Sequence, residues 1–402
     1  MKEQRSEGAK EQSTRHVLWS LTNLLCRLLL AVVFIFSGFV KAVDPKGTQY
    51  KLQDYLTAWG LPDLLPDWAT LTAATTMAAA EFCLGIFMLF AIRRRLTTRL
   101  VLAFMVVMTP LTLWLAITNP ISDCGCFGDA VTLTNWQTFL KNVILLAAAV
   151  IVARNPLRMK RFIPKGLQWV IIHVTLLFIL ATAAYSLYYL PPLDFRPYHV
   201  GADIRKGMEI PPGAPQPQFE TTFILEKDGI QKEFTLDNYP DSTWTFVDSK
   251  TIQTAEGYVP PIHDFSVVER NTEQDITDSL LNDKGYTFLL VAPYLEKADD
   301  ACFGEINQLY DYAQDNGFGF YALTASDDKA VSHWTDITGA DYPFCTTDAT
   351  TLKTIVRSNP GLLLLRQGVI LGKWSHHNLP DTTQIGQIAR NRLHPVHKKP
   401  IK

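Results

Sequence analysis

Residues 97–129 read TTRLVLAFMVVMTPLTLWLAITNPISDCGCFGD, an apolar run that leads directly into a pair of cysteines. No Asp, Glu, Lys or Arg lies between Arg99 and Asp123. A helix needs about 20 predominantly apolar residues to cross the hydrocarbon core of a bilayer, and this run supplies them. The stretch therefore predicts a membrane-spanning helix followed by a short connection that carries two cysteines.

Four more segments have the same character, so the first half of the chain predicts an all-α transmembrane helix bundle. The predicted spans are residues 17–40, 69–92, 97–118, 136–153 and 167–190. Lys and Arg cluster before the first span, between the second and third, and between the fourth and fifth, while residues 118–136 contain neither. Because positive charge marks the cytoplasmic side, the N-terminus is predicted to be cytoplasmic and everything after Leu190 to lie on the far side. A cleaved signal peptide is disfavoured, since the first run is too long and lacks a small-x-small exit.

The composition separates two unlike halves. Of 402 residues, 48% are hydrophobic and 19% are charged, yet the mean hydropathy is only +0.06. Residues 1–190 carry 18 Lys+Arg and 10 Asp+Glu, which leaves 19 and 29 for the rest of the chain. These values exclude a single soluble globule, a collagen-like or disordered chain and a disulfide-dense mini-protein. Nucleic-acid binding is also disfavoured, because the basic residues of the first half lie at the ends of apolar runs.

Two ionisable residues lie inside predicted spans. Arg27 and Glu81 each lie roughly 15 Å from the predicted cytoplasmic end of their span at the helical rise per residue. Since the two spans are antiparallel neighbours, the two side chains are expected to form an ion pair, which relieves the cost of a charge in hydrocarbon. The pair is interpreted either as a packing device or as part of a proton or quinone-headgroup site.

The sharpest chemical signal is the DCGCFGD motif at residues 123–129. In an oxidising compartment, Cys124 and Cys126 can close a small disulfide ring, and the intervening Gly permits the backbone angles that this requires. Such a ring is strained, and strain raises the reduction potential, so the pair is expected to accept electrons. A structural turn disulfide and half of a metal site are the alternatives, although two thiolates in a loop without His are too few for a closed zinc site.

With this loop, the chain resembles the DoxX/MauE group of four-helix membrane proteins, and the Cys-Gly-Cys-Phe-Gly sequence resembles the MauE branch. The resemblance covers about the first 155 residues and also rests on Phe36-Ser37-Gly38-Phe39-Val40-Lys41, Asp44-Pro45, Glu81, Gly85, Trp136 and Asn142. MauE is associated with disulfide formation in an exported dehydrogenase subunit, and DoxX with membrane oxidoreductase complexes. The resemblance therefore implies a membrane redox helper, with the fifth span as an additional tether helix.

The second half predicts an α/β domain after a linker. Prolines at 191–197 and 211–215 predict a stiff spacer. Two apolar segments that flank Asp228-Gly229 predict a small β-hairpin extension. From about residue 258, strands and helices alternate: strands at 286–291, 318–323, 342–345, 361–365 and 369–374 are separated by helices that begin at Cys302, Ser326 (ending at Gly339) and Asp348, and a last helix follows Pro380.

This order resembles a thioredoxin-like domain, nearest the TlpA group, and implies that Pro360 is its cis-proline. The Cys-x-x-Cys that the family carries after the first strand is missing, and Cys302 stands alone near its place. Cys345 is the other cysteine of this half, and a Cys302–Cys345 redox pair is possible but not required by the spacing. The favoured interpretation is that the domain has lost catalysis and binds or positions a partner. No Cys, Asp or third His stands at metal-ligand spacing from His376-His377, so no metal is expected.

These predictions divide the chain into five parts: a cytoplasmic N-terminal tail (1–16), a DoxX/MauE-like four-helix membrane domain (17–155), a cytoplasmic loop with the fifth transmembrane helix (156–190), a Pro-rich linker with the β-hairpin region (191–257) and a thioredoxin-like domain (258–402). The predicted location is the bacterial inner membrane, with the C-terminal domain in the periplasm.

The leading hypothesis is a membrane-anchored thiol–disulfide redox protein. Cys124 and Cys126 exchange electrons between exported protein thiols and a lipid-soluble carrier of the quinone class. Lys41, Glu81 and Arg27 are the polar residues available to orient that carrier. The alternative is a non-enzymatic assembly or scaffold protein of the cell envelope, whose degenerate thioredoxin-like domain binds an exported partner.

Overall fold

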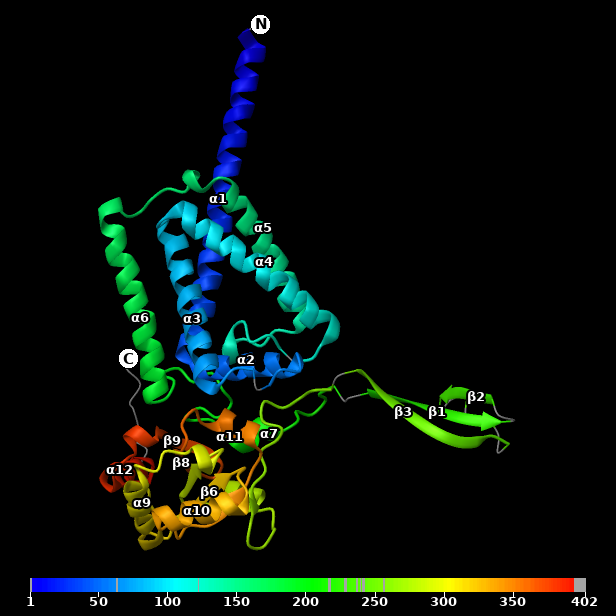
Figure 1. The fold of residues 1–402 in the computed structure, drawn as a ribbon, viewed down its shortest axis with the longest axis vertical. Helices are drawn as coiled ribbons and strands as arrows, with labels where there is room; N and C mark the ends of the chain where they lie inside the picture. Colours follow the sequence, from blue (N-terminus) through cyan, green and yellow to red (C-terminus); the bar gives the residue numbers. More distant parts are fainter. Residues whose placement is uncertain are drawn as a thin grey trace, which may run out of the picture.

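The computed structural model describes residues 2–393, apart from gaps at 63, 122, 216–217, 228–229, 236–237, 239, 241–242 and 256. Within these residues, five helices are long and apolar enough to cross a membrane, which confirms the five predicted spans. They are α1 (Lys2–Val43), α3 (Asp67–Phe90), α4 (Arg94–Thr118), α5 (Asn135–Arg154) and α6 (Gln168–Tyr188). Because α1 begins at Lys2, the segment predicted as an N-terminal tail is helical, and Figure 1 shows it extending beyond the bundle.

Helices α1 and α3 approach closely at two glycines. A Cβ on Gly38 would meet the backbone N of Phe82 and lie 2.7 Å from the carbonyl oxygen of Ala78. A Cβ on Gly85 would lie 2.6 Å from the backbone N of Ile35. Side chains therefore cannot separate the two helices here, and their contact fixes how far α1 is shifted along α3.

The other spans pack around this pair. Helices α4 and α5 contact each other along their length, and Asn142 of α5 donates a hydrogen bond of 3.1 Å to Thr112 of α4. Helix α6 packs Ile179 and Ala183 against α3. It stands apart from α4 and α5 in Figure 1, as expected for a tether added to a four-helix bundle.

A helix that the sequence did not predict as an element, α2 (Pro45–Ala58), lies across the end of the bundle that faces the C-terminal domain (Figure 1). Asp44 is its N-cap and accepts a hydrogen bond of 2.9 Å from the backbone N of Gly47. Pro45 occupies the first helical position, where its missing N–H and fixed φ are tolerated. This helix contacts the cysteine-bearing connection through Lys51 and the α/β domain through Tyr50.

The segment that follows α6 packs on the α/β domain and then leads away from this domain. Tyr198 and Ile204 are buried in the core of that domain, and Ile204 belongs to the short helix α7 (Ile204–Met208). The Pro-rich segment is thus partly an element of the domain and not a free spacer.

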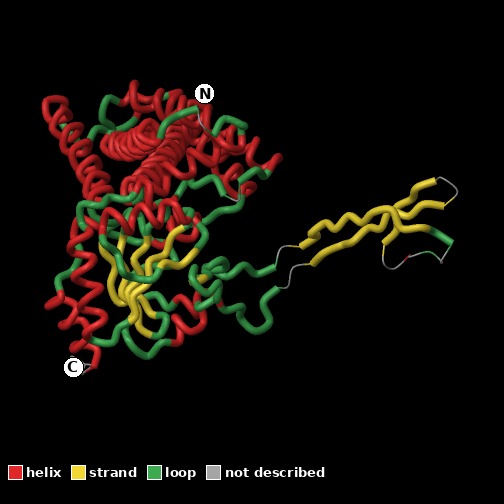
Figure 2. The backbone as a smooth tube through the Cα atoms, turned by 60° about the horizontal axis from the view of Figure 1, so that its bottom comes forward, coloured by secondary structure: helices red, strands yellow, loops and turns green. Residues whose placement is uncertain are grey.

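A separate three-stranded antiparallel sheet follows, with strand order β2-β1-β3. Its strands are β1 (Gln218–Lys227), β2 (Ile230–Thr235) and β3 (Thr245–Ala255). Figures 1 and 2 both show it projecting away from the rest of the molecule. The predicted hairpin is confirmed by the β1–β2 pairing, the turn at Asp228-Gly229 lies outside the described residues, and the third strand was not predicted.

The α/β domain contains a six-stranded sheet of order β4-β7-β6-β5-β8-β9. Strands β5, β6 and β7 are parallel, whereas β8, β9 and β4 pair antiparallel with their neighbours. The strands are β4 (Val268–Glu269), β5 (Thr287–Val291), β6 (Gly319–Thr324), β7 (Phe344–Thr346), β8 (Gly361–Arg366) and β9 (Val369–Ser375).

Helices cover both faces of this sheet. One face packs against α9 (Phe303–Asp315), α10 (Asp328–Thr338) and α12 (Thr382–Leu393). The other packs against α7, α8 (Thr277–Asn282) and α11 (Ala349–Ile355). This arrangement confirms the thioredoxin-like α/β fold, and the Asn359–Pro360 peptide bond is cis as the resemblance implied.

Predicted helix ends were correct at Gly339 and Asp348 and wrong at Ser326. Gly339 is the left-handed C-cap of α10, and Asp348 is the N-cap of α11. The N-cap of α10 is Asp327, which accepts from the backbone N of Ala330. The Ser326 hydroxyl instead donates to Glu296, so it is not available as a cap.

Candidate functional site

The cysteine-bearing connection, residues 119–134, joins α4 to α5 at the end of the bundle that α2 covers. Asp123 accepts a hydrogen bond of 2.8 Å from the backbone N of Gly125, and Lys51 of α2 donates one of 2.8 Å to the same carboxylate. Gly125 has φ +64, in the left-handed region that glycine tolerates. Residues Asp123 and Gly125 thus form a tight turn that places both cysteine side chains toward the bundle.

Within this turn, the two thiols contact each other. Cys124 is buried and Cys126 is partly buried. The Cys124 thiol donates a hydrogen bond to the sulfur of Cys126, and this lowers the pKa of Cys126, with the nearby Lys141 and Lys41 ammonium groups acting in the same direction. The same hydrogen bond, together with burial, raises the pKa of Cys124. Cys126 is therefore the sulfur that carries negative charge first.

A buried polar cluster lies directly beneath Cys126. Lys41 of α1 bonds both carboxylate oxygens of Glu81 on α3, at 2.7 and 2.8 Å. The two side chains are 4% and 3% exposed, so the ion pair is almost completely removed from solvent. An isolated charge in this position would be costly, and each group compensates the other.

Ser37 connects this ion pair to the cysteine loop. Its hydroxyl lies 2.6 Å from Glu81 Oε2 and 2.6 Å from the carbonyl oxygen of Cys126, and it accepts from Lys41 at 3.1 Å. A hydroxyl has one proton, so it donates to only one of these two oxygens at a time. Rotation of this hydroxyl therefore switches its hydrogen bond between the carboxylate of Glu81 and the backbone of Cys126.

Arg27 does not belong to this site, and the predicted Arg27–Glu81 ion pair is wrong. Arg27 donates instead to the carbonyl oxygens of Met88 and Leu89 near the end of α3, and to that of Lys160. The carbonyls at a helix C-terminus have no intrahelical donor, and a guanidinium satisfies them. Arg27 thus caps α3 at the end of the bundle opposite the cysteines.

An apolar cavity of about 200 Å³ lies beside the two cysteines, enclosed mainly by α2, α3 and α4. Both sulfur-bearing residues and Lys41 line it. Its other walls are apolar or aromatic for the most part: Leu52, Tyr55, Leu56, Trp59, Leu65, Ala73, Met77, Met108 and Leu111. The cavity therefore offers an apolar ligand direct access to the thiol pair.

The membrane part of the chain matches a known family. Residues 19–154 match the family model described as methylamine utilisation protein MauE. The membrane bundle is a MauE family domain. This confirms the MauE part of the predicted resemblance, while its DoxX part stays a prediction.

Other comparisons concern the second half. Residues 219–256, which include most of β1 and all of β2 and β3, match a domain of unknown function, DUF8463. Among curated proteins, none matches. The solved structures that match include a candidate protein disulfide isomerase of Bacteroides thetaiotaomicron (16% identity, 32% of this chain and 84% of that chain, TM-score 0.26) and a candidate thioredoxin of Neisseria meningitidis (13% identity, 33% and 96%, TM-score 0.27).

The thioredoxin-like domain places its two cysteines apart. Cys302 packs in the cluster that contains Leu290 and Leu362, whereas Cys345 packs in the cluster that contains Leu289. Successive residues of a strand point to opposite faces of a sheet, so the two cysteines lie on opposite faces. The Cys302–Cys345 pair that the sequence left open is therefore excluded.

Neither of these thiols has the environment of a reactive cysteine. Cys302 is the N-cap of α9, but burial and the carboxylate of Asp299 raise its pKa to about 11. Burial raises the pKa of Cys345 to about 12. Both residues remain largely protonated at neutral pH, and only the thiolate is nucleophilic.

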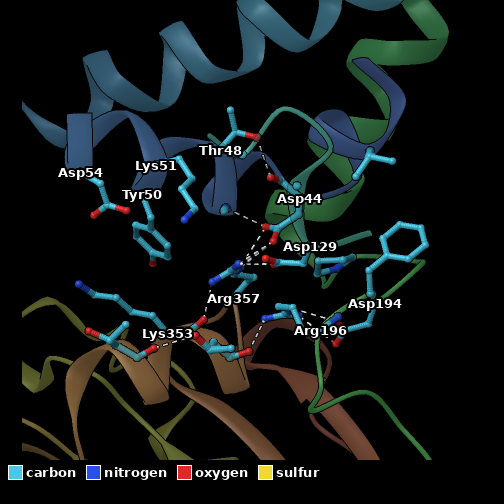
Figure 3. Close-up of a pocket in the computed structure, with 18 of the residues that line it drawn as sticks. Asp44, Thr48, Tyr50, Lys51, Asp54, Asp129, Asp194, Arg196, Lys353 and Arg357 are labelled. Carbon is cyan, nitrogen blue, oxygen red and sulfur yellow. Dashed lines mark hydrogen bonds and ion pairs between the residues drawn. The ribbon is translucent and has the colours of Figure 1, made fainter. Parts of the chain in front are cut away.

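The thioredoxin-like domain docks on the MauE domain through Arg357, close to the cis-proline (Figure 3). The guanidinium bonds both carboxylate oxygens of Asp44 at 2.8 to 3.0 Å and approaches Asp129 at 3.4 Å. It also lies over the ring of Tyr50 in α2. Burial alone would raise the pKa of Asp44, but the charge of Arg357 holds it below its usual value.

Sequence reasoning missed several residues of the site. Ser37 belongs to the MauE-like pattern but was not predicted as a site residue, and Lys141 lies outside that pattern. Arg357 and Asp44 are separated by most of the chain. The Asp44-Pro45 sequence, typical of a helix start, was the one available signal for α2.

Proposed function

We propose that this protein is a membrane-embedded thiol–disulfide oxidase. It would transfer electrons from exported protein thiols, through Cys124 and Cys126, to a lipid-soluble carrier of the quinone class. The observation that carries the proposal is that both cysteines and Lys41 line one apolar cavity inside a MauE family bundle. A redox pair beside an apolar cavity can react with a carrier that resides in the membrane.

The proposed cycle balances in two steps. In the first, the dithiol of Cys124 and Cys126 forms an S–S bond and releases two electrons and two protons, which reduce a quinone to a quinol. In the second, one thiol of an exported client attacks this disulfide and forms a mixed disulfide, which the second thiol of the client then attacks. The client gains a disulfide, and the Cys124–Cys126 pair regains its two protons and two electrons.

The environment of Cys126 supports the proposed direction of electron flow. The hydrogen bond from Cys124 and the two nearby ammonium groups stabilise its thiolate. Stabilising the reduced form of a dithiol makes its disulfide a stronger oxidant. The pair is therefore suited to take electrons from a client and pass them on.

The Lys41–Glu81–Ser37 cluster supports the proton part of the cycle. Oxidation of the dithiol releases protons at a site that is largely closed to water, and the Ser37 hydroxyl joins Glu81 to the loop at 2.6 Å on each side. When Glu81 receives a proton from the thiol pair, the charge of Lys41 is balanced by the thiolate of Cys126, so neither charge is left alone.

The experiment follows the quinone and the thiols together. Pre-reduced protein in detergent is mixed with a short-chain ubiquinone analogue, quinol formation is measured by absorbance, and mass spectrometry locates the disulfide. We expect one quinol per chain and a Cys124–Cys126 disulfide. Cys83→Ser, which changes a buried thiol of α3, is the matched control and should behave like the wild type. Unchanged thiols at Cys124 and Cys126 after quinone addition would refute the proposal.

The proposed location is the inner membrane of a bacterium, with the N-terminus cytoplasmic and the thioredoxin-like domain in the periplasm. The clustering of Lys and Arg at the opposite end of the bundle supports this orientation. A membrane-impermeant maleimide added to intact spheroplasts should label a cysteine introduced at Lys329, an exposed residue of the thioredoxin-like domain, and leave a cysteine introduced at Ser6 unlabelled. Labelling of position 6 alone would reverse the orientation.

A second candidate function is that of an envelope scaffold, and the buried cysteines and docking contact of the thioredoxin-like domain favour it. Its two cysteines are buried with raised pKa values, and its cis-proline segment contacts the MauE domain through Arg357. Such a domain would hold an exported partner without redox chemistry. A Cys124→Ser/Cys126→Ser variant decides between the two: full complementation of a deletion strain supports the scaffold, and complete loss supports the oxidase.

A further inference from the structure

A second cluster of ligating side chains lies on the thioredoxin-like domain, beside its cis-proline segment. It comprises Asp299, which follows the 3-10 turn Leu295–Lys297, and His376 and His377, which begin the turn His376–Asn378 after β9. One ligating atom from each residue lies within 4.8 Å of the other two. His376 Nε2 is 3.5 Å from Asp299 Oδ2. No metal was expected from the sequence, in which Asp299 is far from the two histidines. Only the fold brings the three residues together.

The hydrogen bonds around Ser358 fix which nitrogen of His376 faces the aspartate. The Ser358 hydroxyl, which is buried, donates to the carbonyl oxygen of Pro360 at 2.5 Å. Ser358 Oγ also lies 2.7 Å from His376 Nδ1, so the serine holds this nitrogen of the ring. The other ring nitrogen, Nε2, is left facing Asp299.

The 3.5 Å separation between His376 Nε2 and Asp299 Oδ2 suits a shared cation. The lone pair of Nε2 and the carboxylate oxygen repel unless a proton or a metal ion is shared. Zinc binds imidazole nitrogen and carboxylate oxygen at about 2.0 to 2.2 Å, which separates two tetrahedral ligands by roughly 3.3 to 3.6 Å. The observed separation matches this distance.

The burial of Ser358 excludes a Ser358–His376–Asp299 catalytic triad. The nucleophilic serine of such a triad must reach the substrate. Ser358 is only 4% exposed, and its hydroxyl also contacts the carbonyl oxygen of Pro360 at 2.5 Å. The serine is therefore a positioning residue that holds the imidazole, as is usual for the second nitrogen of a metal-bound histidine.

We propose that Asp299, His376 and His377 form a binding site for a divalent transition metal ion of the zinc class. Two imidazoles and one carboxylate are the ligand set of zinc sites that keep an open fourth position. That position lies at the corner of the fold where a thioredoxin carries its cysteines. The site is independent of the thiol pair in the membrane bundle.

The site also has a structural consequence for the fifth span. The ring of His377 packs on that of Tyr188, the last residue of α6, with centroids 4.0 Å apart. Ser375, which caps the histidine-bearing turn, donates to the carbonyl oxygen of Tyr188 at 3.2 Å. Metal binding would therefore join the Asp299 loop, the histidine turn and the end of the tether helix.

The test measures metal binding to the full-length protein, purified in detergent with a tag that contains no histidine. The chain is stripped with a chelator, titrated with Zn²⁺ or Co²⁺, and examined by elemental analysis and by the visible absorption of Co²⁺. We expect one equivalent per chain and a Co²⁺ spectrum of tetrahedral nitrogen and oxygen ligands. Asp299→Asn and His376→Ala should each weaken binding at least tenfold, and Ser358→Ala should weaken it by about 10- to 100-fold.

Three controls and one further ligand variant complete the test. His333→Ala removes an exposed histidine of α10 and should leave binding unchanged. Thermal unfolding of each variant shows whether the domain is intact, and His377→Ala supplies a second ligand variant at an exposed position. Cys124→Ser/Cys126→Ser should still bind one equivalent. Loss of the metal in this double variant, equal binding by the His376 and His333 variants, or less than stoichiometric binding by the wild type would overturn the proposal.

Discussion

The hydrogen bond between the two thiols of the MauE domain predicts how Cys126 responds to the residue at position 124. In Cys124→Ala, no donor faces the Cys126 sulfur, whereas in Cys124→Ser a hydroxyl replaces the thiol. A hydrogen bond to a charged group contributes about 1.5–3 kcal/mol. One pKa unit corresponds to about 1.4 kcal/mol, so the pKa of Cys126 should be higher in the alanine variant than in the serine variant by about 1 to 2 units.

The assay is the pH dependence of alkylation at Cys126, resolved from the other cysteines by peptide mass spectrometry. Because the folded-state pKa is lowered, the thiolate persists below the usual range of a free thiol and is lost only as the pH falls through the lowered value. We expect the midpoint in Cys124→Ser to lie below about 8.5, the ordinary thiol value, and the midpoint in Cys124→Ala to lie above that of the serine variant. Equal midpoints in the two variants would refute the assigned hydrogen bond.

Three further predictions concern the packing of the bundle and the docking of the two domains. Gly38→Ala should destabilise the bundle by about 1–3 kcal/mol, since its Cβ would meet the α3 backbone, whereas Gly166→Ala, with open space around it, should be neutral in thermal unfolding. Glu81→Gln should cost about 3–5 kcal/mol because it leaves a buried lysine uncompensated, and adding Lys41→Met should restore most of the loss in the same measurement. Arg357→Ala should release the thioredoxin-like domain from α2, seen as faster limited proteolysis between the two domains. An unchanged cleavage rate would show that the Arg357 contact does not hold them together.

The spans were predictable because each one needs its own run of apolar residues long enough to cross the bilayer. Which residues of two neighbouring helices lie side by side was not predictable. Arg27 and Glu81 were placed at equal depth by counting from the ends of their apolar runs, but the close contact at Gly38 and Gly85 shifts α1 along α3. This shift brings Lys41 to Glu81 and Arg27 to the end of α3.

In the second half, element order was predictable and neighbouring side chains were not. Periodicity and capping residues located the strands and helices of the thioredoxin-like fold, including the cap at Asp348. The contact of Asp299 with His376 depends on how loops from distant segments close over one corner of the sheet. No local pattern encodes that closure, so a dihistidine sequence alone carried too little information to predict a ligand set.

The docked arrangement connects the α/β domain to the surroundings of the two thiols. The segment next to the cis-proline carries Arg357, which contacts Asp44 and Asp129. Asp44 begins α2, a wall of the cavity beside the thiols, and Asp129 ends the cysteine-bearing motif. A single guanidinium therefore connects the domain to both segments that enclose Cys124 and Cys126, and loss of its contacts would loosen both segments at once.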